Sequence, residues 1–587
     1  MLLAALTLLL LLAIIPARAS ITGAHLRPPA VPLVTHNPFF SVWSPADKLI
    51  EADSVHWTRH AHPLRSLIRV DGATFRLLGA TPQESPALPQ TGLEITPTTT
   101  LATFEGQGVR VGLSFCSPLL PDDLDVLSRP VTYVNWKVAS LDSQEHSVQL
   151  YFEASPLLTV NQPDEAVVWE RAEVKGLVAL KTGTETQAVL TSKGDDHRIN
   201  WGYLYLAAPE EASLASALTS GPQAREQFEQ SGALLARDDE HQPRPANSEE
   251  PVLALAFDLG DVTEVVERHA LLAYDEEWAV TYFGQRLRPY WRRTGKDAVW
   301  LLEQAEKDRE ELLARCKRFD SELMADLTAA ASAQYADIAT LSYRQALAGC
   351  GLVADSAGKP LLFPKENTSN GCMGTVDVFY PAAPLMLALS PALARAMLVP
   401  LLDYSASERW PWPYAPHDIG VYPLGEGQVY GGGERTEEGQ MPVEESANML
   451  LLVAATCRAE DSGAFAKEWW PILSEWAAYL RKKGFDPAHQ LCTDDFAGPF
   501  AHNVNLSLKA ILALGAYAQL ALLVGDESEA LASRNLAERF AKRWLKEADE
   551  GDHYRLAFDQ PGTWSTKYNL IWDGILEIGR ASCRERV

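Results

Sequence analysis

The chain is poor in basic residues. It has 51 lysines and arginines against 77 aspartates and glutamates, which gives a formal net charge of −26 at pH 7. A protein this acidic repels phosphate backbones and anionic membrane surfaces, so no nucleic-acid partner is expected. Apolar residues are not in short supply, because 47% of the chain is hydrophobic. That share is ordinary for globular domains.

Long hydrophobic runs are also scarce. The apolar run from Leu2 to Ile15 is too short to span a bilayer and has the length of a signal-peptide core. Ala17 and Ala19 supply the small residues of a cleavage site, so we expect residues 1–19 to be a signal peptide. The protein is then secreted, periplasmic or at the cell surface, with no transmembrane span in the mature chain. The alternative is an N-terminal anchor, because no lysine or arginine precedes the run.

Several chemical signatures are missing. The cysteines lack the paired close spacing of a zinc site, and neither H-E-x-x-H nor G-x-S-x-G occurs. The glycine run 431–433 lacks the Lys-Ser/Thr ending of a phosphate-binding loop. These absences disfavour a thiolate zinc site, a zincin, an α/β-hydrolase and a nucleotide site. The nearest cysteine pair for a disulfide in an oxidising compartment is Cys350 with Cys372.

The C-terminal end has an unusual sequence. Residues 577–587 read E-I-G-R-A-S-C-R-E-R-V, the translation of a common sequencing adapter. We expect this stretch to be an artefact, with the natural chain continuing beyond Leu576. The alternative is a genuine basic tail.

The first half of the chain has the pattern of β-structure. Short segments rich in β-branched and aromatic residues recur between turn residues, several alternating apolar with polar side chains: Leu67–Val70, Val109–Phe115, Val131–Val138, Val148–Phe152, Thr186–Thr191 and Tyr203–Leu206. This pattern predicts a β-sandwich over residues 91–296, with residues 20–90 packing on it. The polar, proline-bearing stretch 236–251 is expected to be an exposed loop.

From about residue 297 the apolar spacing becomes helical. Amphipathic segments are expected at Ala298–Ala333, Ala336–Ala348, Ala382–Leu402, Glu444–Cys457, Ala464–Lys483, Leu506–Val524 and Glu527–Lys546. Paired helices of this length predict an α/α toroid of helical hairpins over residues 297–576. The adapter-like end makes this toroid incomplete. The chain is thus a multidomain α and β protein.

Three loops before expected helices are crowded with polar groups. They span residues 364–381, 410–448 and 493–505, and a ligand in them would meet the backbone N–H groups of helix N-termini. Their carboxylates could serve as a general acid and base, for a glycosidic bond or for an amide. A first-turn acidic residue such as Glu444 also has a simpler interpretation, which is that it complements the helix dipole. Calcium is a further alternative, held by Glu366, Asp377 and Asp418; otherwise no cofactor is expected.

Strings along the whole mature chain resemble the glutaminase A family. They are P-L-V-T-H-N-P-F-F-S-V-W-S, H-W-T-R-H, L-L-A-Y-D-E, E-N-T-S-N-G-C-M-G-T-V-D-V-F-Y-P, P-H-D-I-G-V-Y-P, G-Q-V-Y-G-G-G-E, M-P-V-E-E-S-A-N-M-L, H-N-V-N-L-S-L-K-A-I and G-T-W-S-T-K-Y-N-L-I-W-D. The resemblance implies an N-terminal β domain and a toroid similar to six-hairpin glycosidases. It also implies hydrolysis of L-glutamine to glutamate and ammonia. One departure is Gly498-Pro499-Phe500-Ala501 before His502, which puts the shape of the third loop in doubt.

With this resemblance, the leading hypothesis is a secreted glutaminase-type amidohydrolase whose acid and base are Asp418, Glu444 and Glu445. Direct attack by water is expected, since no nucleophile triad is evident. The remaining polar and aromatic candidates are expected to bind substrate: Glu366, Asn367, Asn370, Asp377, Trp412, His417, Tyr430, Asn448, Asp495, His502 and Asn503. The alternatives are an inverting glycoside hydrolase and a carbohydrate-binding protein without catalysis. The substrate is a small molecule, either glutamine or a glycan, and the sequence leaves the oligomeric state open.

Overall fold

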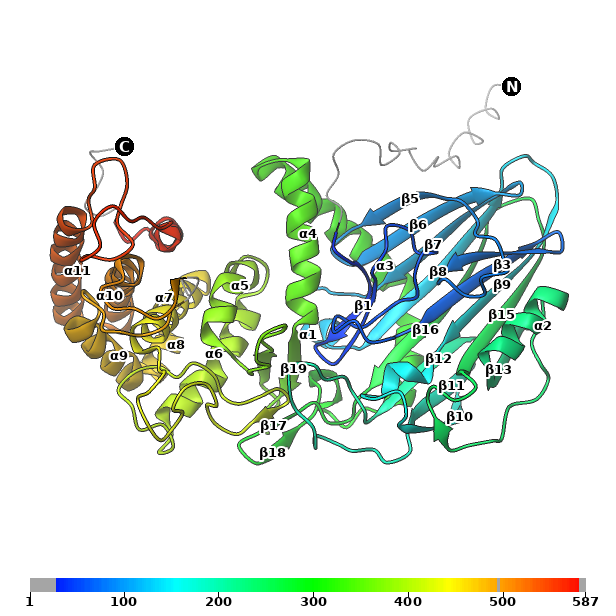
Figure 1. Ribbon diagram of the computed structural model, residues 1–587, viewed down its shortest axis with the longest axis horizontal. Coiled ribbons are helices and arrows are strands. Elements are labelled where there is room, and N and C mark those ends of the chain that lie inside the picture. Colours follow the sequence, from blue (N-terminus) through cyan, green and yellow to red (C-terminus); the bar gives the residue numbers. More distant parts are fainter. Residues whose placement is uncertain (1–27, 493–496, 580–587) are drawn as a thin grey trace, which may run out of the picture.

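The computed structural model describes residues 28–492 and 497–579, which form a β-rich lobe and a helical lobe (Figure 1). The expected signal peptide at 1–19, the candidate Asp495 and most of the adapter-like end lie outside these described residues. The two lobes confirm the predicted class, an N-terminal β-sandwich followed by a domain of helical hairpins.

Two antiparallel sheets make the sandwich. The larger sheet has the strand order β14 (Arg244–Pro245), β10 (Ala166–Val174), β11 (Leu177–Thr184), β12 (Tyr203–Pro209), β16 (Val266–Asp275), β8 (Val131–Ser140), β7 (Val109–Cys116), β6 (Thr99–Gly106) and β5 (Gln90–Ile95). The smaller sheet has the order β13 (Leu214–Ser220), β15 (Pro251–Val262), β9 (His146–Ala154), β3 (Leu64–Val70) and β4 (Ala73–Leu78). Helix α2 (Gly221–Ser231) covers the outer face of the smaller sheet, where Phe228 packs on Tyr151.

Residue alternation explains how the sheets face each other. In β6 every second residue is buried, and β7 repeats the pattern through Val109, Val111, Leu113 and Phe115. Trp136 of β8 contacts Phe152 and Phe257 of the smaller sheet, with ring centroids 5.3 and 5.9 Å apart. The core therefore lies between the sheets, as period-2 patterns require.

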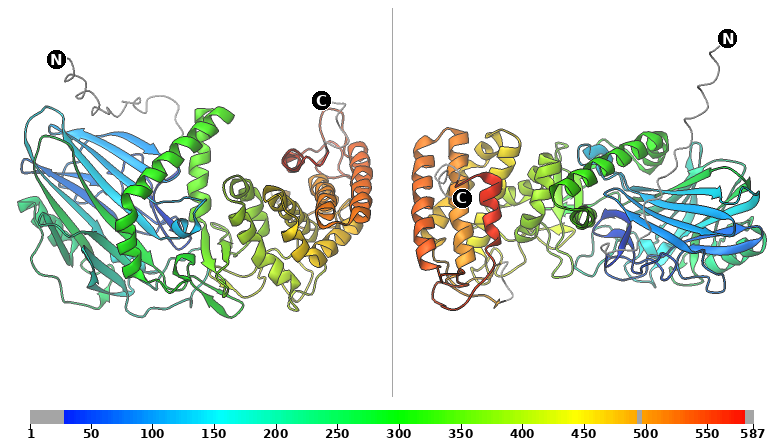
Figure 2. Two further views of the ribbon diagram at one scale, coloured as in Figure 1. Left: turned by 180° about the vertical axis from the view of Figure 1, so that it is seen from behind. Right: turned by 90° about the horizontal axis from the view of Figure 1, so that it is seen from above.

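The boundaries of the β domain differ from those expected. Residues 20–90 do not merely pack on the sandwich, because β3 and β4 are strands of its smaller sheet. Helix α3 (Ala298–Ala330) lies at the start of the range expected for the toroid, but it crosses the outer face of the larger sheet (Figure 2, left). Its residues Leu301 and Leu312 share a buried cluster with Tyr133 and Leu271 of the sheet. The sheet has one outer face to cover, and the apolar stripe of α3 covers it.

The helical lobe is an arc of hairpins. After α4 (Ala333–Ala348), the hairpins in the described residues pair α5 (Val376–Leu389) with α6 (Pro391–Ala406), α7 (Pro442–Ala459) with α9 (Trp470–Lys483), and α10 (Val504–Val524) with α11 (Glu527–Glu547). Short helices α8 (Ala464–Glu468) and α12 (Ile571–Leu576) complete the helical lobe, whereas the short helix α1 (Leu124–Leu127) lies between β7 and β8 in the β domain. Helices α5, α7 and α10 pack side by side, so their N-terminal ends lie near one another.

Helix α10 is long and apolar enough to cross a membrane by length and composition, and it alone is so among the helices of the described residues. Of its most apolar window, 78% is buried inside the protein, as in the core helix of a water-soluble domain. It contacts α7, α9 and α11. We therefore describe it as the centre of the helical lobe.

Small β-elements join the two lobes. They are β1 (Val31–Asn37) with β2 (Phe40–Ser44), β19 (Cys350–Ala354) with β20 (Pro360–Pro364), and a three-stranded sheet of β18 (Gln285–Leu287), β17 (Val280–Tyr282) and β21 (Leu424–Gly425). The last sheet pairs a strand from the end of the β domain with one from the helical lobe. Backbone hydrogen bonds thus cross the junction.

A buried histidine makes the β domain sensitive to acid. His62 is fully buried, its Nδ1 donates to the Ser41 carbonyl at 3.0 Å, and burial lowers its pKa to about 3. The unfolded chain takes up this proton near pH 6.5. The contribution of neutral His62 to the free energy of unfolding is therefore fully present above pH 6.5. It is lost as pH falls from 6.5 towards 3, by about 1.4 kcal/mol per pH unit.

We expect the substitution His62→Gln to remove this dependence. Urea unfolding at pH 7 and pH 5 should show a smaller loss of stability in the variant than in the wild type. Burial and the charge of Asp275 raise the pKa of Glu276 to about 8, so its effect on the pH dependence of stability is opposite to that of His62. This effect is the same in the variant and the wild type, and it cancels when their losses are compared. Equal losses in the two chains would contradict the assignment.

Candidate active site

The N-terminal ends of α5 and α7 bring the expected site residues together. Asp377 lies in the first turn of α5, and Glu444 and Glu445 lie in the first turn of α7. The loop carrying His417 reaches the same place, because the N–H of Val376 donates to the carbonyl of His417 at 2.9 Å. An oxygen of Asp377, a ring nitrogen of His417 and an oxygen of Glu445 all lie within 4.8 Å of one another. We call these three residues the catalytic cluster.

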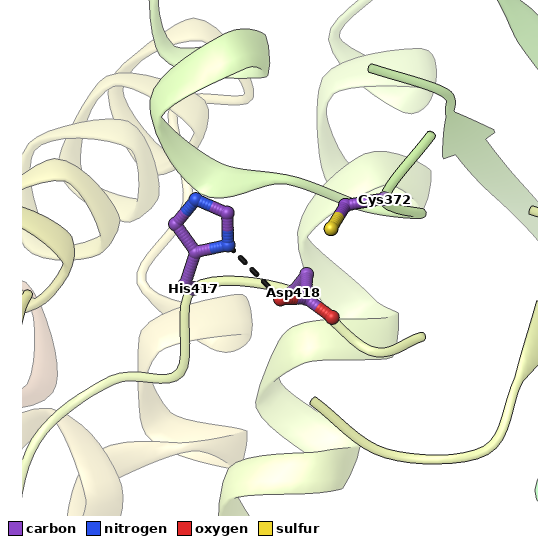
Figure 3. Close-up of side chains that lie close together, drawn as sticks. All are labelled: Cys372, His417 and Asp418. Carbon is purple, nitrogen blue, oxygen red and sulfur yellow. Dashed lines mark hydrogen bonds and ion pairs between the residues drawn. The ribbon is translucent and has the colours of Figure 1, made fainter. Parts of the chain in front are cut away.

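Asp418 was expected to be an acid or base, but its carboxylate is fully engaged. One oxygen accepts from the N–H groups of Gly420 and Val429 at 2.9 and 3.0 Å. The other accepts from His417 Nδ1 at 2.9 Å and from the N–H of Tyr430 at 3.2 Å. Four donors at two oxygens leave little capacity for a substrate. These hydrogen bonds hold Asp418 against the ring of His417 (Figure 3), and a catalytic role for Asp418 stays a prediction.

His417 is held in a charged, enclosed position. Its ring stacks on Tyr430 with centroids 4.3 Å apart, and its Nε2 lies 3.7 Å from an oxygen of Asp377. Burial disfavours the imidazolium, but the hydrogen bond to Asp418 and the charges of Asp418 and Asp377 outweigh burial and raise the pKa of His417. This environment, with a carboxylate on either side of the ring, favours the protonated form of His417.

Glu445 is the most enclosed carboxyl group of the cluster. It is 0% exposed, and one of its oxygens accepts from Asn448 Nδ2 at 3.0 Å. The other oxygen has no hydrogen-bond partner within the described residues, and neither has Asn448 Oδ1. Burial first, and then the charges of Asp377 and Glu444, raise the pKa of Glu445 well above 4.5. This environment favours the protonated form of Glu445.

The neighbouring Glu444 has a different environment. It is 1% exposed and forms an ion pair with Lys509 of α10, which is 0% exposed. The ammonium of Lys509 also lies 4.2 Å from the ring centroid of Tyr380. Glu444 is therefore more than a residue that complements the helix dipole. The sequence analysis did not identify Lys509, although a charged residue within the apolar run L-S-L-K-A-I-L-A-L was a visible signal.

Cys372 does not complete a nucleophilic triad. Its thiol lies beside Asp418 rather than across the imidazole from it (Figure 3). Burial first, and then the charge of Asp418, raise the pKa of this thiol. A protonated thiol is a poor nucleophile. The expected disulfide with Cys350 is not formed either, because both are free in the structure.

Other expected binding residues have structural contacts. Asn503 caps α10 by accepting from the N–H of Leu506, and Asn370 accepts from the N–H of Cys372. His502 is 43% exposed and pairs with Asp486 rather than with the cluster. Trp412 donates to the Gly433 carbonyl, and Asn367 accepts from Lys365. These contacts give five of the expected binding residues partners within the protein, and their binding of substrate stays a prediction.

The carboxylates therefore converge as an enzyme requires, which the non-catalytic interpretation did not predict. Glu366 also faces them, since its charge contributes to the raised pKa values of Asp377 and His417. The calcium alternative needed Asp418, whose oxygens are already engaged. Calcium binding by Glu366, Asp377 and Asp418 stays a prediction, and loss of activity on chelation is its test.

Three family models match successive stretches of the chain. A family model described as "Glutaminase A six helical-hairpin domain" matches residues 332–581. Two further models, both described as domains of unknown function, match residues 98–326 and 15–86. The six-hairpin model begins at residue 332, directly before α4. Most of α3 therefore lies in the stretch 98–326, whose model also covers most of the β-sandwich.

Similar structures are glycoside hydrolases at low similarity. A bacterial glucoamylase complexed with acarbose has a TM-score of 0.47 and 11% identity, covering 92% of this chain and 73% of the other. A gh92 family glycosyl hydrolase has a TM-score of 0.36 and 11% identity, covering 92% and 65%.

Two curated relatives match nearly the whole chain. Glutaminase A of Aspergillus oryzae is 30% identical over 578 residues, which are 95% of this chain and 82% of the relative. A probable glutaminase of Arthroderma benhamiae is 26% identical, covering 96% of this chain and 75% of the relative. With the matched domain and this coverage, the chain belongs to the glutaminase A family of hydrolases.

Proposed function

We propose that the protein hydrolyses the side-chain amide of L-glutamine, with Glu445 as general acid and Asp377 as general base. The observation that carries the proposal is the compact cluster, in which oxygens of both carboxyl groups and a nitrogen of His417 lie within 4.8 Å of one another. In amide hydrolysis one proton leaves the attacking water at the carbonyl carbon and another reaches the adjacent nitrogen, so the acid and the base act close together. An inverting glycosidase instead separates its carboxyl groups by about 6.5–9.5 Å to admit water between them.

Different surroundings assign the two carboxyl groups different roles. Glu445 is fully buried, and burial raises its pKa well above 4.5, which favours the protonated form that an acid needs. Burial also raises the pKa of Asp377, but His417 opposes that rise, so Asp377 is the group more readily ionised beside an imidazolium. The pair shares one proton, as two close carboxyl groups do.

The reaction then balances without a cofactor. Asp377 takes a proton from water as the water oxygen bonds to the amide carbon. The imidazolium of His417, held by Asp418, offsets the negative charge on the amide oxygen. Glu445 gives its proton to the nitrogen as the carbon–nitrogen bond breaks, and ammonia leaves. The proton on Asp377 returns to Glu445, and the carboxylic acid product gives its proton to the released ammonia, so that glutamate and ammonium leave.

Measuring ammonia release from L-glutamine tests the proposal. We expect release by the wild type and none above background by the variant Asp377→Asn. An exposed acid such as Glu438 provides the matched control, and Glu438→Gln should behave as the wild type. Equal release by Asp377→Asn and the wild type would contradict the role of Asp377.

One observation favours a second candidate, a glycoside hydrolase. The α-carboxylate of glutamine needs a positive partner, yet Lys509, Lys365 and His417 already pair with Glu444, Asp195 and Asp418. A neutral sugar has no such requirement. Release of nitrophenol from aryl glycosides, with no ammonia from glutamine, would support this candidate. Under either candidate the proposal includes export, because of the apolar run at Leu2–Ile15.

A further inference from the structure

The β-sandwich reaches the active site through the loop between β11 and β12. One oxygen of Asp195, on this loop, accepts from Lys365 Nζ and from the N–H of Thr368, each at 2.9 Å. These two donors lie on either side of Glu366. A single carboxylate oxygen from the β domain therefore binds both ends of the segment that carries Glu366.

Lys365 is enclosed and depends on this partner. It is 2% exposed, donates to Asn367 Oδ1 at 3.0 Å, and lies 4.6 Å from the ring centroid of Trp57 in the β domain. Burial lowers the pKa of Lys365, while its hydrogen bond to Asp195 opposes that change. Asp195 is the carboxylate that pairs with this buried ammonium.

The backbones of the two loops also approach closely. Gly371 has φ of +76°, and a Cβ there would lie 2.7 Å from the nitrogen of Asp195. Tyr422 donates its N–H to the carbonyl of Gly371 at 3.0 Å and accepts from the N–H of Gly194 at 3.4 Å. Tyr422 follows His417 in the same loop. The β-domain loop, the Glu366 loop and the His417 loop are thus joined by hydrogen bonds.

The position of Glu366 matters to the cluster. Its Oε2 is buried and has no hydrogen-bond partner in the part of the chain that the structure describes. Its charge acts on both Asp377 and His417. A shift of the loop would therefore move a negative charge relative to the reacting groups.

We propose that Asp195 is a positioning residue of the active site, holding the Glu366 loop against the catalytic cluster through Lys365 and Thr368. The β-sandwich is then part of the catalytic unit and not a separate module. This inference rests on the hydrolase function proposed above. A displacement of about 1 Å in a positioned group can reduce turnover by about 10²-fold.

Two measurements on Asp195→Ala test the proposal. Hydrogen exchange of the peptide covering residues 365–372 should become faster, because the bond to the N–H of Thr368 is lost. The kcat should fall by about 10²-fold with KM changed much less. Asp195→Asn keeps an acceptor for Thr368, so we expect an intermediate kcat and nearly normal exchange.

Asp196→Ala is the matched control. It removes a carboxylate one residue along that pairs with Arg198 at 2.8 Å instead of Lys365. Unchanged exchange in Asp195→Ala, or an equal loss of kcat in Asp196→Ala, would overturn the proposal. If the wild type acts on neither glutamine nor glycosides, the proposed function fails, and the exchange measurement alone decides the role of Asp195.

Discussion

The substitution Glu445→Gln is expected to lower kcat by about 10²–10⁴-fold, the range by which a positioned general acid accelerates a reaction. Glutamine has the same shape and keeps an acceptor for Asn448 Nδ2, which donates to Glu445 at 3.0 Å. The fold should therefore survive. Steady-state kinetics on the substrate that the wild type hydrolyses, together with thermal unfolding, would separate lost chemistry from lost structure.

The pH profile gives a second measure of the same group. A general acid acts only when protonated, so activity is present below the pKa of Glu445 and is lost as pH rises through it. Burial and the charges of Asp377 and Glu444 place that pKa well above 4.5. The variant should lack this alkaline limb, whereas Glu438→Gln should retain it. A variant with wild-type kcat would exclude Glu445 as the acid.

Local periodicity predicted most elements of the fold. It failed where a side chain, instead of a neighbouring strand, makes the hydrogen bonds to the backbone. The segment 186–191 has strand-forming residues, yet Gln187 and Leu190 have φ of 45° and 55°. The side-chain amide of Gln187 donates to the Thr184 carbonyl and accepts from the N–H of Gly202. These two hydrogen bonds form where β11 ends, at Thr184. Helix α3 was predicted nearly to its ends, but its partner was not. An apolar stripe does not specify which surface covers it.

The active site was predicted in its residue types but not in its roles. The sequence identified Asp377, His417 and Glu445 because all three lie in polar segments that lead into helices. Asp377 and Glu445 stand in the first turns of α5 and α7, and His417 stands in the loop before α7. The sequence could not show that four N–H donors engage Asp418, since those donors come from two separated segments. Lys509 was missed for a related reason. Its ion pair joins residues 65 positions apart, and only the packing of α7 on α10 brings them together.

The substitution Lys509→Met is expected to destabilise the protein by about 3–5 kcal/mol, the usual effect of removing one partner from a buried ion pair. Methionine replaces the aliphatic stem of Lys509 and leaves Glu444, 1% exposed, without its ammonium. Urea unfolding followed by a helical signal would measure the loss. Lys482→Met, at the basic end of α9, is the control for removing a lysine from an exposed position.

The double variant Lys509→Met, Glu444→Gln distinguishes charge from packing. If the loss arises from an uncompensated carboxylate, removing that charge should restore most of the stability, because a buried ion pair replaced on both sides is often neutral. The contact of the buried ammonium with Tyr380 contributes about 2 kcal/mol, and the double variant lacks it too. A double variant as unstable as Lys509→Met would therefore assign the loss to packing and to Tyr380. Recovery would assign the loss to the ion pair of Glu444 with Lys509, beside which the neighbouring Glu445 has its raised pKa.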